Sequence, residues 1–257
     1  MSQGIYVIIP TYNEAENIQR LVGEVLDLPV GAGVIVVDDN SPDGTGGLVA
    51  EMASANPVRV HVIRRPGKLG LGTAYVAGFR FALGELGAAK VMTMDADFSH
   101  LPGYIPAMVE LASEKHIVIG SRYVPGGGTA RWPFSRKLLS WGANTFTRLA
   151  LGLKAHDTTA GFRLYHRQVL ETVPPESIRS SGYSFLIEML LMCELQGFRV
   201  GEVPIIFEDR RQGTSKISKD EIARAMHTVF RLIPRRLQKR EPLRPVPSGS
   251  RWESDCG

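Results

Sequence analysis

The sequence predicts an α/β protein built on a mostly parallel sheet with helices on both faces. Short apolar runs alternate with amphipathic stretches in units of about 30 residues over the first half of the chain. Each apolar run stops at polar or turn-forming residues, as buried parallel strands do. Hydrophobic residues make up 44% of the 257 residues and charged residues 22%, a composition that can bury a substantial core.

The alternation of elements is regular in the first half. Apolar and β-branched runs predict the strands, and apolar residues at helical spacing predict the helices. The first helix, for example, places Ile18, Leu21 and Val25 on one face. In chain order, the expected elements are strand Ile5–Ile9, helix Asn13–Leu28, strand Val34–Val37, helix Leu48–Ser54, strand Val58–Ile63, helix Thr73–Gly87, strand Val91–Met94, helix Ile105–Lys115 and strand Ile117–Gly120.

The second half is less regular. We expect a Gly/Pro loop at Val124–Ser135, an apolar helix with scattered basic residues at Arg136–Leu153, a buried helix at Tyr183–Gln196, a strand at Val200–Phe207 and a long amphipathic helix at Ile217–Arg240. From Glu241 onward, Pro, Ser and charge replace periodicity, which predicts disorder. The expected division is a domain over 1–216 with an interfacial helix at about 136–153, a basic amphipathic helix over 217–240 and a disordered tail over 241–257.

Composition excludes several classes of protein. No apolar run approaches the roughly 18 residues that span a bilayer, and the chain enters a strand-like run almost at once. We therefore expect neither a membrane span nor a signal peptide. The two cysteines, Cys193 and Cys256, predict a reducing compartment without a disulfide framework. The net charge of +4 favours anionic partners, and we expect no nucleic acid among them.

Three common kinds of ligand site do not fit the sequence. A dinucleotide site needs Gly-x-Gly-x-x-Gly directly after the first strand, where this chain has Pro-Thr-Tyr-Asn-Glu. No Gly-Lys-Ser/Thr phosphate loop occurs, and the six histidines show no zinc-site spacing. The chemistry is therefore expected at the polar ends of the strands.

Carboxylates follow several of the predicted strands. Ligands of open parallel sheets bind at the carboxyl ends of the strands, where this chain carries Glu14, Asp38-Asp39, Asp95-Ala96-Asp97 and Arg122. Carboxylates gathered on one edge repel each other, and a divalent cation such as Mg²⁺ or Mn²⁺ relieves this repulsion. The alternative is that these aspartates only form turns and cap helices.

The combination of motifs resembles glycosyltransferase family 2, whose inverting members have the GT-A nucleotide-sugar-binding fold. The resemblance begins with Pro-Thr-Tyr-Asn-Glu at 10–14, Val-Asp-Asp-Asn-Ser-Pro-Asp-Gly-Thr at 37–45 and Met-Asp-Ala-Asp-Phe-Ser-His at 94–100. Within the family, the chain looks like the dolichyl- or polyprenyl-phosphate mannose synthases. The further matching segments are Arg64–Thr73, Ile119–Tyr123, Gly126–Gly128, Trp132–Ser140, Asp157–Arg163 and Phe207–Lys216.

The resemblance implies a site for GDP-mannose and a divalent metal. The metal, Mg²⁺ or Mn²⁺, would be held by Asp95, Asp97 and Ser99, although some relatives carry Gln where this chain has Ser99. The metal would bridge the diphosphate and stabilise the leaving group. The residues implied in nucleotide-sugar binding are Pro10, Tyr12, Asn13, Glu14, Asp38, Asp39, Lys68, Asp95, Ala96, Asp97, Arg210 and Lys216.

The acceptor implied by the resemblance is a polyprenyl or dolichyl monophosphate. Such a phosphate is already anionic at neutral pH, so its attack needs positioning by cations and no general base. Arg122 and Arg136 suit this role because a guanidinium fork matches phosphate oxygens, and Ser140 lies nearby on the same helix. Asp97, Arg122 and Arg136 are the residues expected to be catalytic. The product would be a β-linked mannosyl phosphate.

Two segments could meet the membrane that holds such an acceptor. We expect the helix over 217–240 to dock at the cytoplasmic face, with apolar insertion and attraction to anionic lipid acting together. The residues concerned are Ile222, Met226, Val229, Phe230 and Ile233 on the apolar side and Arg231, Arg235, Arg236, Lys239 and Arg240 near the basic end. The alternatives are that both helices only pack on the sheet, that residues 136–153 dock, or that a membrane-anchored partner protein recruits the chain.

Two other functions stay open at this point. The same fold could make another lipid-phosphate sugar, such as a glucosyl phosphate from a UDP donor, because these residues do not distinguish guanine from uracil. A nucleotide-sugar-binding subunit without turnover is the second alternative. The intact pair Asp95 and Asp97, together with Arg122 and Arg136, argues against it.

Overall fold

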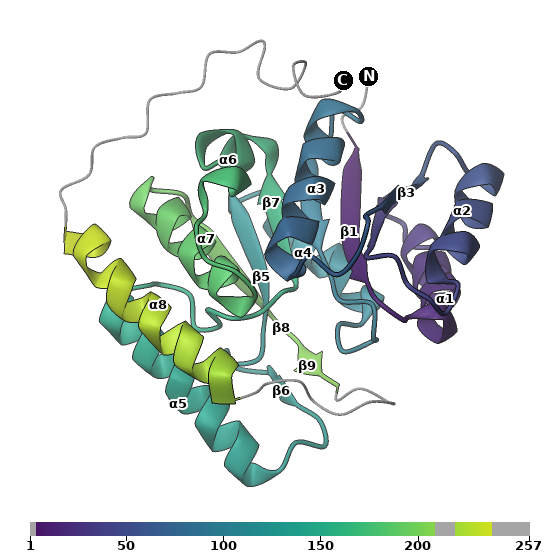
Figure 1. Cartoon of the computed structure of the whole chain (residues 1–257). Helices are drawn as coiled ribbons and strands as arrows, with labels where there is room; N and C mark the ends of the chain where they lie inside the picture. The colour runs from purple at the N-terminus through teal and green to yellow at the C-terminus, as the bar shows by residue number, and fades with distance from the viewer. Residues whose placement is uncertain (1–3, 209–218, 238–257) are drawn as a thin grey trace.

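The computed structural model describes residues 4–208 and 219–237 (Figure 1). Within these residues, seven strands form one sheet in the order β3-β2-β1-β4-β7-β5-β8, and every neighbouring pair is parallel except the two pairs made by β7. The predicted mostly parallel sheet is therefore confirmed. The strands are β1 (Ile5–Thr11), β2 (Gly33–Asp38), β3 (Val60–Arg64), β4 (Lys90–Thr93), β5 (Ile117–Ser121), β7 (Arg163–His166) and β8 (Val200–Pro204), with β6 (Gly128–Thr129) and β9 (Ile206–Phe207) paired separately.

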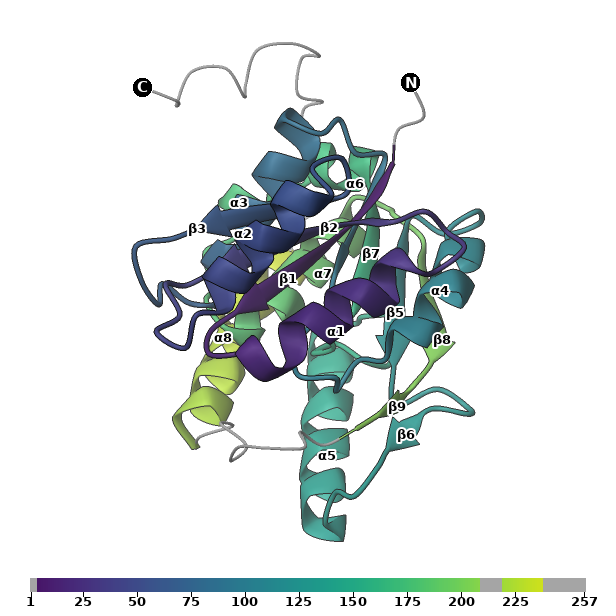
Figure 2. The same ribbon diagram turned by 90° about the vertical axis from the view of Figure 1, so that its right-hand side faces the viewer.

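Helices cover both faces of the sheet (Figures 1 and 2). They are α1 (Ala15–Leu26), α2 (Thr45–Ala55), α3 (Leu71–Gly84), α4 (Ile105–Leu111), α5 (Phe134–Leu151), α6 (Arg167–Thr172), α7 (Tyr183–Leu195) and α8 (Lys219–Leu237). Because successive side chains of a strand point to opposite faces, β1 supplies Val7 and Ile9 to one core and Ile8 to the other. The first core includes α1, α2 and α4, and the second includes α3, α6, α7 and α8.

Strand β7 was not expected from the sequence. It is only four residues long, and it begins with Arg163, a charged residue that a buried strand rarely contains. The Arg163 side chain is fully buried because its guanidinium donates to the carbonyl oxygens of Thr158, Ala160 and Leu186 at 2.7–2.8 Å. Since β7 runs opposite to its neighbours, the loop before it lies at the carboxyl ends of β4 and β5.

Several other expected elements differ from the structure in their bounds: the helices expected to end at Gly87 and Lys115, for example, end at Gly84 and Leu111. The strand expected over Val200–Phe207 is divided into β8 and β9, and β9 pairs with β6 inside the segment expected to be a loop. Helix α2 begins at Thr45 and so starts before the apolar run that predicted it. The boundaries proposed at 216 and 241, and the predicted tail, lie outside the described residues.

Helix α8 packs against α7 and α5. Its Val229 and Leu232 are fully buried. Two of its arginines contact a carboxylate without exposed surface: the Arg231 Nη2 atom lies 3.0 Å from Glu188 Oε2, and the Arg235 Nη1 atom lies 2.8 Å from Glu188 Oε1. Part of the basic charge that predicted membrane docking therefore neutralises Glu188.

The predicted docking helix over 217–240 is described only in part. Lys239, Arg240 and residues 217–218 lie outside the described residues, as does the side chain of Ile222. Within the described ranges, no helix combines the length and the apolar character needed to cross a membrane.

Candidate functional site

The loops after β1 and β2 are tied together at the edge of the sheet. The backbone N–H of Asn13 donates to Ser41 Oγ, and that of Glu14 donates to Thr45 Oγ1, both at 3.0 Å. The backbone N–H of Ala15 donates to the Asp43 carboxylate at 3.0 Å. These bonds bring two segments expected to bind the nucleotide into one surface.

The two aspartates after β2 are both buried and both paired. Asp38 accepts hydrogen bonds from Thr11 Oγ1 at 3.0 Å and from Ser41 Oγ at 2.5 Å. Asp39 forms an ion pair with Arg65, which also donates to Thr73 Oγ1 at 2.7 Å. The structure therefore shows Asp38 and Asp39 shaping the loops, and their contact with a nucleotide stays a prediction.

Tyr12 and Lys68 meet on the exposed side of this surface. The Lys68 ammonium lies 4.5 Å from the centroid of the Tyr12 ring, and 37% of Tyr12 is exposed. A partly exposed ring with a cation beside it offers a flat contact for a base and a positive charge for a phosphate. Two residues expected to bind the nucleotide sugar are thus brought together from different loops.

The Asp95-Ala96-Asp97 turn follows β4. Asp97 Oδ1 accepts hydrogen bonds from Ser99 Oγ at 2.6 Å and from the Ser99 backbone N–H at 3.1 Å. The backbone N–H of Asp95 donates to His100 Nδ1 at 3.2 Å. His100 is buried, and burial lowers its pKa, so the ring is neutral and accepts this bond. Ser99 and His100 therefore hold the turn that carries both carboxylates.

The turn that carries Asp95 and Asp97 suits a hard divalent cation that also binds a substrate. In the described part of the chain, no group of three or more His, Cys, Asp and Glu residues is arranged to hold a metal. A pair of carboxylates suits Mg²⁺ or Mn²⁺, which commonly take their other ligands from substrate phosphates and water. Ser99 is 1% exposed and donates its hydroxyl proton to Asp97, so the structure shows it orienting the Asp97 carboxylate. Its expected role as a metal ligand stays a prediction.

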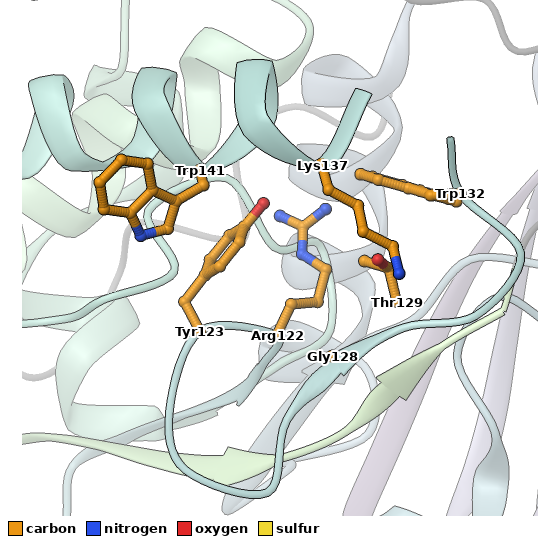
Figure 3. A pocket seen from close by; sticks show the side chains of 7 residues that line it. All are labelled: Arg122, Tyr123, Gly128, Thr129, Trp132, Lys137 and Trp141. Atoms are coloured by element: carbon orange, nitrogen blue, oxygen red, sulfur yellow. The ribbon is translucent and has the colours of Figure 1, made fainter. Parts of the chain in front are cut away.

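A second cluster forms a pocket of about 270 Å³ at the start of α5 (Figure 3). The residues that line it are Arg122, Tyr123, Gly128, Thr129, Trp132, Lys137 and Trp141. The Arg136 guanidinium stacks 3.9 Å from the centroid of the Trp132 ring, and the Tyr123 hydroxyl donates to Ser140 Oγ at 2.7 Å. All three residues expected to bind the lipid phosphate, Arg122, Arg136 and Ser140, therefore line this pocket or touch its wall.

Sequence reasoning missed several residues of the pocket. Lys137 adds a cation, and Trp132, Trp141 and Tyr123 add aromatic surface. The signal was present in the segment Trp132–Ser140, where the adjacent basic residues Arg136 and Lys137 are flanked by large apolar ones. These residue types suit a ligand that has both an anionic and an apolar part.

The loop before β7 connects the turn that follows β4 with the pocket at the start of α5. Gly161 lies beside the Asp95-Ala96-Asp97 turn, because a Cβ atom added there would be 3.5 Å from Asp95 Oδ1 and 3.2 Å from Tyr75 Oη. On the other side of the same loop, Asp157 accepts a hydrogen bond from the backbone N–H of Arg122 at 3.1 Å. The residues that follow β4 and those that follow β5 are thus connected by one short segment.

Arg210 and Lys216 lie outside the described residues. The first described range ends at Glu208, whose backbone N–H donates to the carbonyl oxygen of Ser99 at 3.3 Å. Glu208 is therefore next to the turn that carries Asp97. The expected contact of Arg210 and Lys216 with a diphosphate stays a prediction.

A comparison with protein families decides the classification. The family model described as "Glycosyl transferase family 2" matches residues 6–173. The chain belongs to glycosyltransferase family 2. A polyprenol monophosphomannose synthase from Mycolicibacterium smegmatis is 46% identical over 229 residues, which are 89% of this chain and 86% of that protein. An undecaprenyl-phosphate mannosyltransferase from Micrococcus luteus is 43% identical over 227 residues, which are 88% of this chain and 93% of that protein.

Solved structures confirm the predicted GT-A fold of this family 2 member. Glucosyl-3-phosphoglycerate synthase from Mycobacterium tuberculosis, in complex with Mn²⁺, UDP and its product, matches with a TM-score of 0.62 and 18% identity over 91% of this chain and 80% of that chain. A mannosyltransferase from Pyrobaculum calidifontis, in complex with GDP-Man and Mn²⁺, matches with a TM-score of 0.54 and 18% identity over 91% and 71% of the two chains. At this identity the likeness concerns the fold.

Proposed function

We propose that this glycosyltransferase transfers mannose from GDP-mannose to a polyprenyl monophosphate. The observation that carries the proposal is the 46% identity, over most of both chains, to a polyprenol monophosphomannose synthase. The pocket at α5 supports it, because cationic and aromatic side chains together suit a phosphate that carries a hydrocarbon chain. Inversion at the mannose carbon C1 would give a β-linked mannosyl phosphate.

The donor would lie over the loops that follow β1, β2 and β4. Tyr12 and Lys68 would contact the nucleotide, and Asp95 and Asp97 would hold the metal. When bound, the metal supplies positive charge that stabilises the diphosphate leaving group. The further donor contacts in this proposal are Pro10, Asn13, Glu14, Asp38, Asp39, Ala96, Arg210 and Lys216.

The acceptor phosphate would lie in the pocket between Arg122, Arg136 and Ser140. One of its anionic oxygens would attack mannose C1 as the bond from C1 to the GDP oxygen breaks, and the electron pair of that bond would leave with GDP. No proton has to be removed, because the attacking oxygen already carries negative charge at neutral pH. The arginines would orient the phosphate, and the surrounding rings would limit the access of water.

An assay with two donors tests the proposed reaction. The purified protein is incubated with Mn²⁺, detergent-dispersed undecaprenyl phosphate and either radiolabelled GDP-mannose or radiolabelled UDP-glucose. The proposal expects label from GDP-mannose in the organic phase, dependent on the lipid and released by mild acid. Transfer from UDP-glucose alone would replace the donor assignment, and the absence of transfer from both donors would refute the proposed reaction.

We also propose that α5 is the element that meets the membrane. Its side facing the protein buries Asn144, Thr147 and Leu151, whereas most of its large apolar side chains point outward and are exposed. A helix that only packs on a core would bury those large apolar side chains instead. The exposed apolar residues are Phe134 (79%), Leu138 (54%), Leu139 (57%), Trp141 (54%), Phe146 (37%) and Leu149 (74%).

Charge on α5 favours an anionic lipid surface as the occupant of this face. The helix carries Arg136, Lys137 and Arg148 and contains no acidic residue. Basic residues beside an inserted apolar face strengthen binding to anionic headgroups. Among the sequence-based alternatives, docking through residues 136–153 is therefore favoured over docking through 217–240. The cytoplasmic side remains the expected location.

A further inference from the structure

The Arg122 side chain is held by a buried aspartate. Asp157 has no exposed surface, and its two oxygens accept bonds from Arg122 Nε and Nη2, both at 2.7 Å. Asp157 also accepts from the backbone N–H of Arg122 at 3.1 Å and from that of Ala160 at 3.0 Å. Each carboxylate oxygen therefore accepts two hydrogen bonds, one from the Arg122 guanidinium and one from a backbone N–H.

A second group of the same loop fixes the end of the guanidinium. Arg122 Nη2 donates to Thr159 Oγ1 at 2.9 Å. The guanidinium carbon lies 5.2 Å from the Tyr123 ring centroid and 5.4 Å from that of Phe207, so aromatic rings pack around the charge. Figure 3 shows the guanidinium in the pocket, between the Tyr123 ring and the Lys137 side chain and directed toward α5.

The charge balance of this arrangement is informative. Burial alone would raise the pKa of Asp157, but the Arg122 charge and its hydrogen bonds hold that pKa below its ordinary value, so Asp157 is ionised. The pair then contributes no net charge to the pocket. Arg136 and Lys137 supply the positive charge that attracts a phosphate, while Arg122 supplies a donor group of fixed direction.

We propose that Asp157, assisted by Thr159, is the positioning residue of the acceptor site: it fixes the direction in which Arg122 presents its guanidinium to the phosphate. The inference rests on the proposed function, because it assigns the pocket to the lipid phosphate. Asp157 offsets the charge of Arg122 as well as orienting it. The phosphate is thereby held in line for attack without strong ion pairing from all three cations at once.

Kinetics of Asp157→Asn test the inference. An amide keeps the shape but cannot accept both bonds as a carboxylate does, so Arg122 loses its fixed direction. Misplacement of a catalytic group costs on the order of 100-fold, and we expect about that loss in kcat/KM for undecaprenyl phosphate. We expect KM for GDP-mannose to change less than about threefold, because Asp157 does not belong to the donor loops. A rise in KM for GDP-mannose as large as the loss in kcat/KM for the lipid phosphate would overturn the inference.

Adjacent threonines provide a matched pair that does not change charge. Thr159→Val removes the acceptor of Arg122 Nη2, and it should lower kcat/KM for the lipid phosphate about tenfold, as expected for one hydrogen bond to a charged group. Thr158→Val removes a hydroxyl that donates to Asn144 and does not touch Arg122. Asn144, which also donates to Thr159 Oγ1, still accepts from the backbone N–H of residue 158, so both substrate constants should change less than about threefold. This comparison holds even where Asp157→Asn lowers the melting temperature. Equal effects of the two threonine variants would contradict the inference.

A double-variant cycle separates positioning from a general structural role. If Asp157 acts through Arg122, adding Asp157→Asn to Arg122→Met should cost less than about threefold in kcat/KM, against about 100-fold in the wild-type background. A full further loss, or wild-type rates for Arg122→Met alone, would overturn the inference while leaving the proposed function in place. A wild-type protein that transfers no mannose would overturn the proposed function and the inference with it.

Discussion

Replacing Leu149 by aspartate tests the proposal that α5 docks on the membrane. Leu149 is 74% exposed, so insertion of α5 would bury most of its side chain. Full burial of a leucine is worth about 2 kcal/mol, and three quarters of that is about 1.5 kcal/mol. The aspartate adds a desolvation cost of its own. Because 1.4 kcal/mol corresponds to a factor of ten, vesicle binding should weaken at least tenfold.

Val58 supplies a matched control for this substitution. It is 75% exposed and lies before β3, at the end of the sheet opposite the site. Val58→Asp therefore makes a similar change of polarity and charge on a surface that we do not expect to meet lipid. Co-sedimentation with vesicles that contain anionic phospholipid gives the comparison, and melting temperatures show whether both variants fold.

The result that would refute this reasoning is a Leu149→Asp variant that binds vesicles as the wild type and Val58→Asp do. Charge reversal on α8 would be a less direct test, because Arg235→Glu places a carboxylate against the buried Glu188. Such a variant would lose stability for a reason unrelated to lipid. Transfer to a short, detergent-soluble lipid phosphate should stay near the wild-type rate in Leu149→Asp, since Leu149 lies outside the pocket.

Three further predictions concern the metal, the acceptor and the pH dependence of stability. Asp97→Ala should reduce mannose transfer at least 100-fold and abolish metal-dependent donor binding, which titration calorimetry with GDP and Mn²⁺ measures. Full activity of the wild-type protein in EDTA would contradict the assignment of a metal to Asp97. Arg136→Ala should raise KM for undecaprenyl phosphate about tenfold or more and leave the affinity for GDP-mannose unchanged. Arg136→Lys should restore only part of the lost lipid affinity, since an ammonium lacks the two parallel donors of a guanidinium. Loss of affinity for GDP-mannose in Arg136→Ala would instead assign Arg136 to the donor site. Burial lowers the pKa of His61, so on acidification the unfolded chain takes up a proton before the folded chain does. The free energy of unfolding that is present above about pH 6.5 is therefore partly lost as the pH falls through the lowered pKa. His61→Phe, which keeps a ring between Tyr6 and Phe81, should lose less stability between pH 7.5 and 5.5 in urea unfolding, and an unchanged pH slope would argue against this linkage.

The sheet and the strand-end residues could be predicted because they follow regular patterns. The run from Ile5 to Ile9 forms part of β1, and the run from Val34 to Val37 forms part of β2, with side chains buried on both faces. Parallel pairing then brings Asp38 and Asp95 to the same edge, as the sequence implied. These features depend on local periodicity and on one rule of topology.

Long-range polar pairing could not be predicted. Arg163 looks like a surface residue in the sequence, but three carbonyl oxygens allow it to start a buried strand. The basic residues of α8 suggested lipid headgroups, but Arg231 and Arg235 contact Glu188 on α7. Asp157 and Arg122 are 35 residues apart, and no periodicity links them. Each partner became visible only when the fold brought distant segments together.

The position of β7 sets the distance between the two halves of the proposed site. Neighbouring strands lie about 4.8 Å apart, so β4 and β5, with β7 between them, are separated by about 10 Å. In the proposed reaction, that span leaves room for a single sugar ring between a diphosphate bound after β4 and a phosphate bound after β5. Because backbone hydrogen bonds of the sheet fix this spacing, side-chain changes at the rim cannot alter it. If the two substrates bind as proposed, the spacing of the strands limits the transferred group to one hexose, and selection among lipids depends on the pocket rim and on α5.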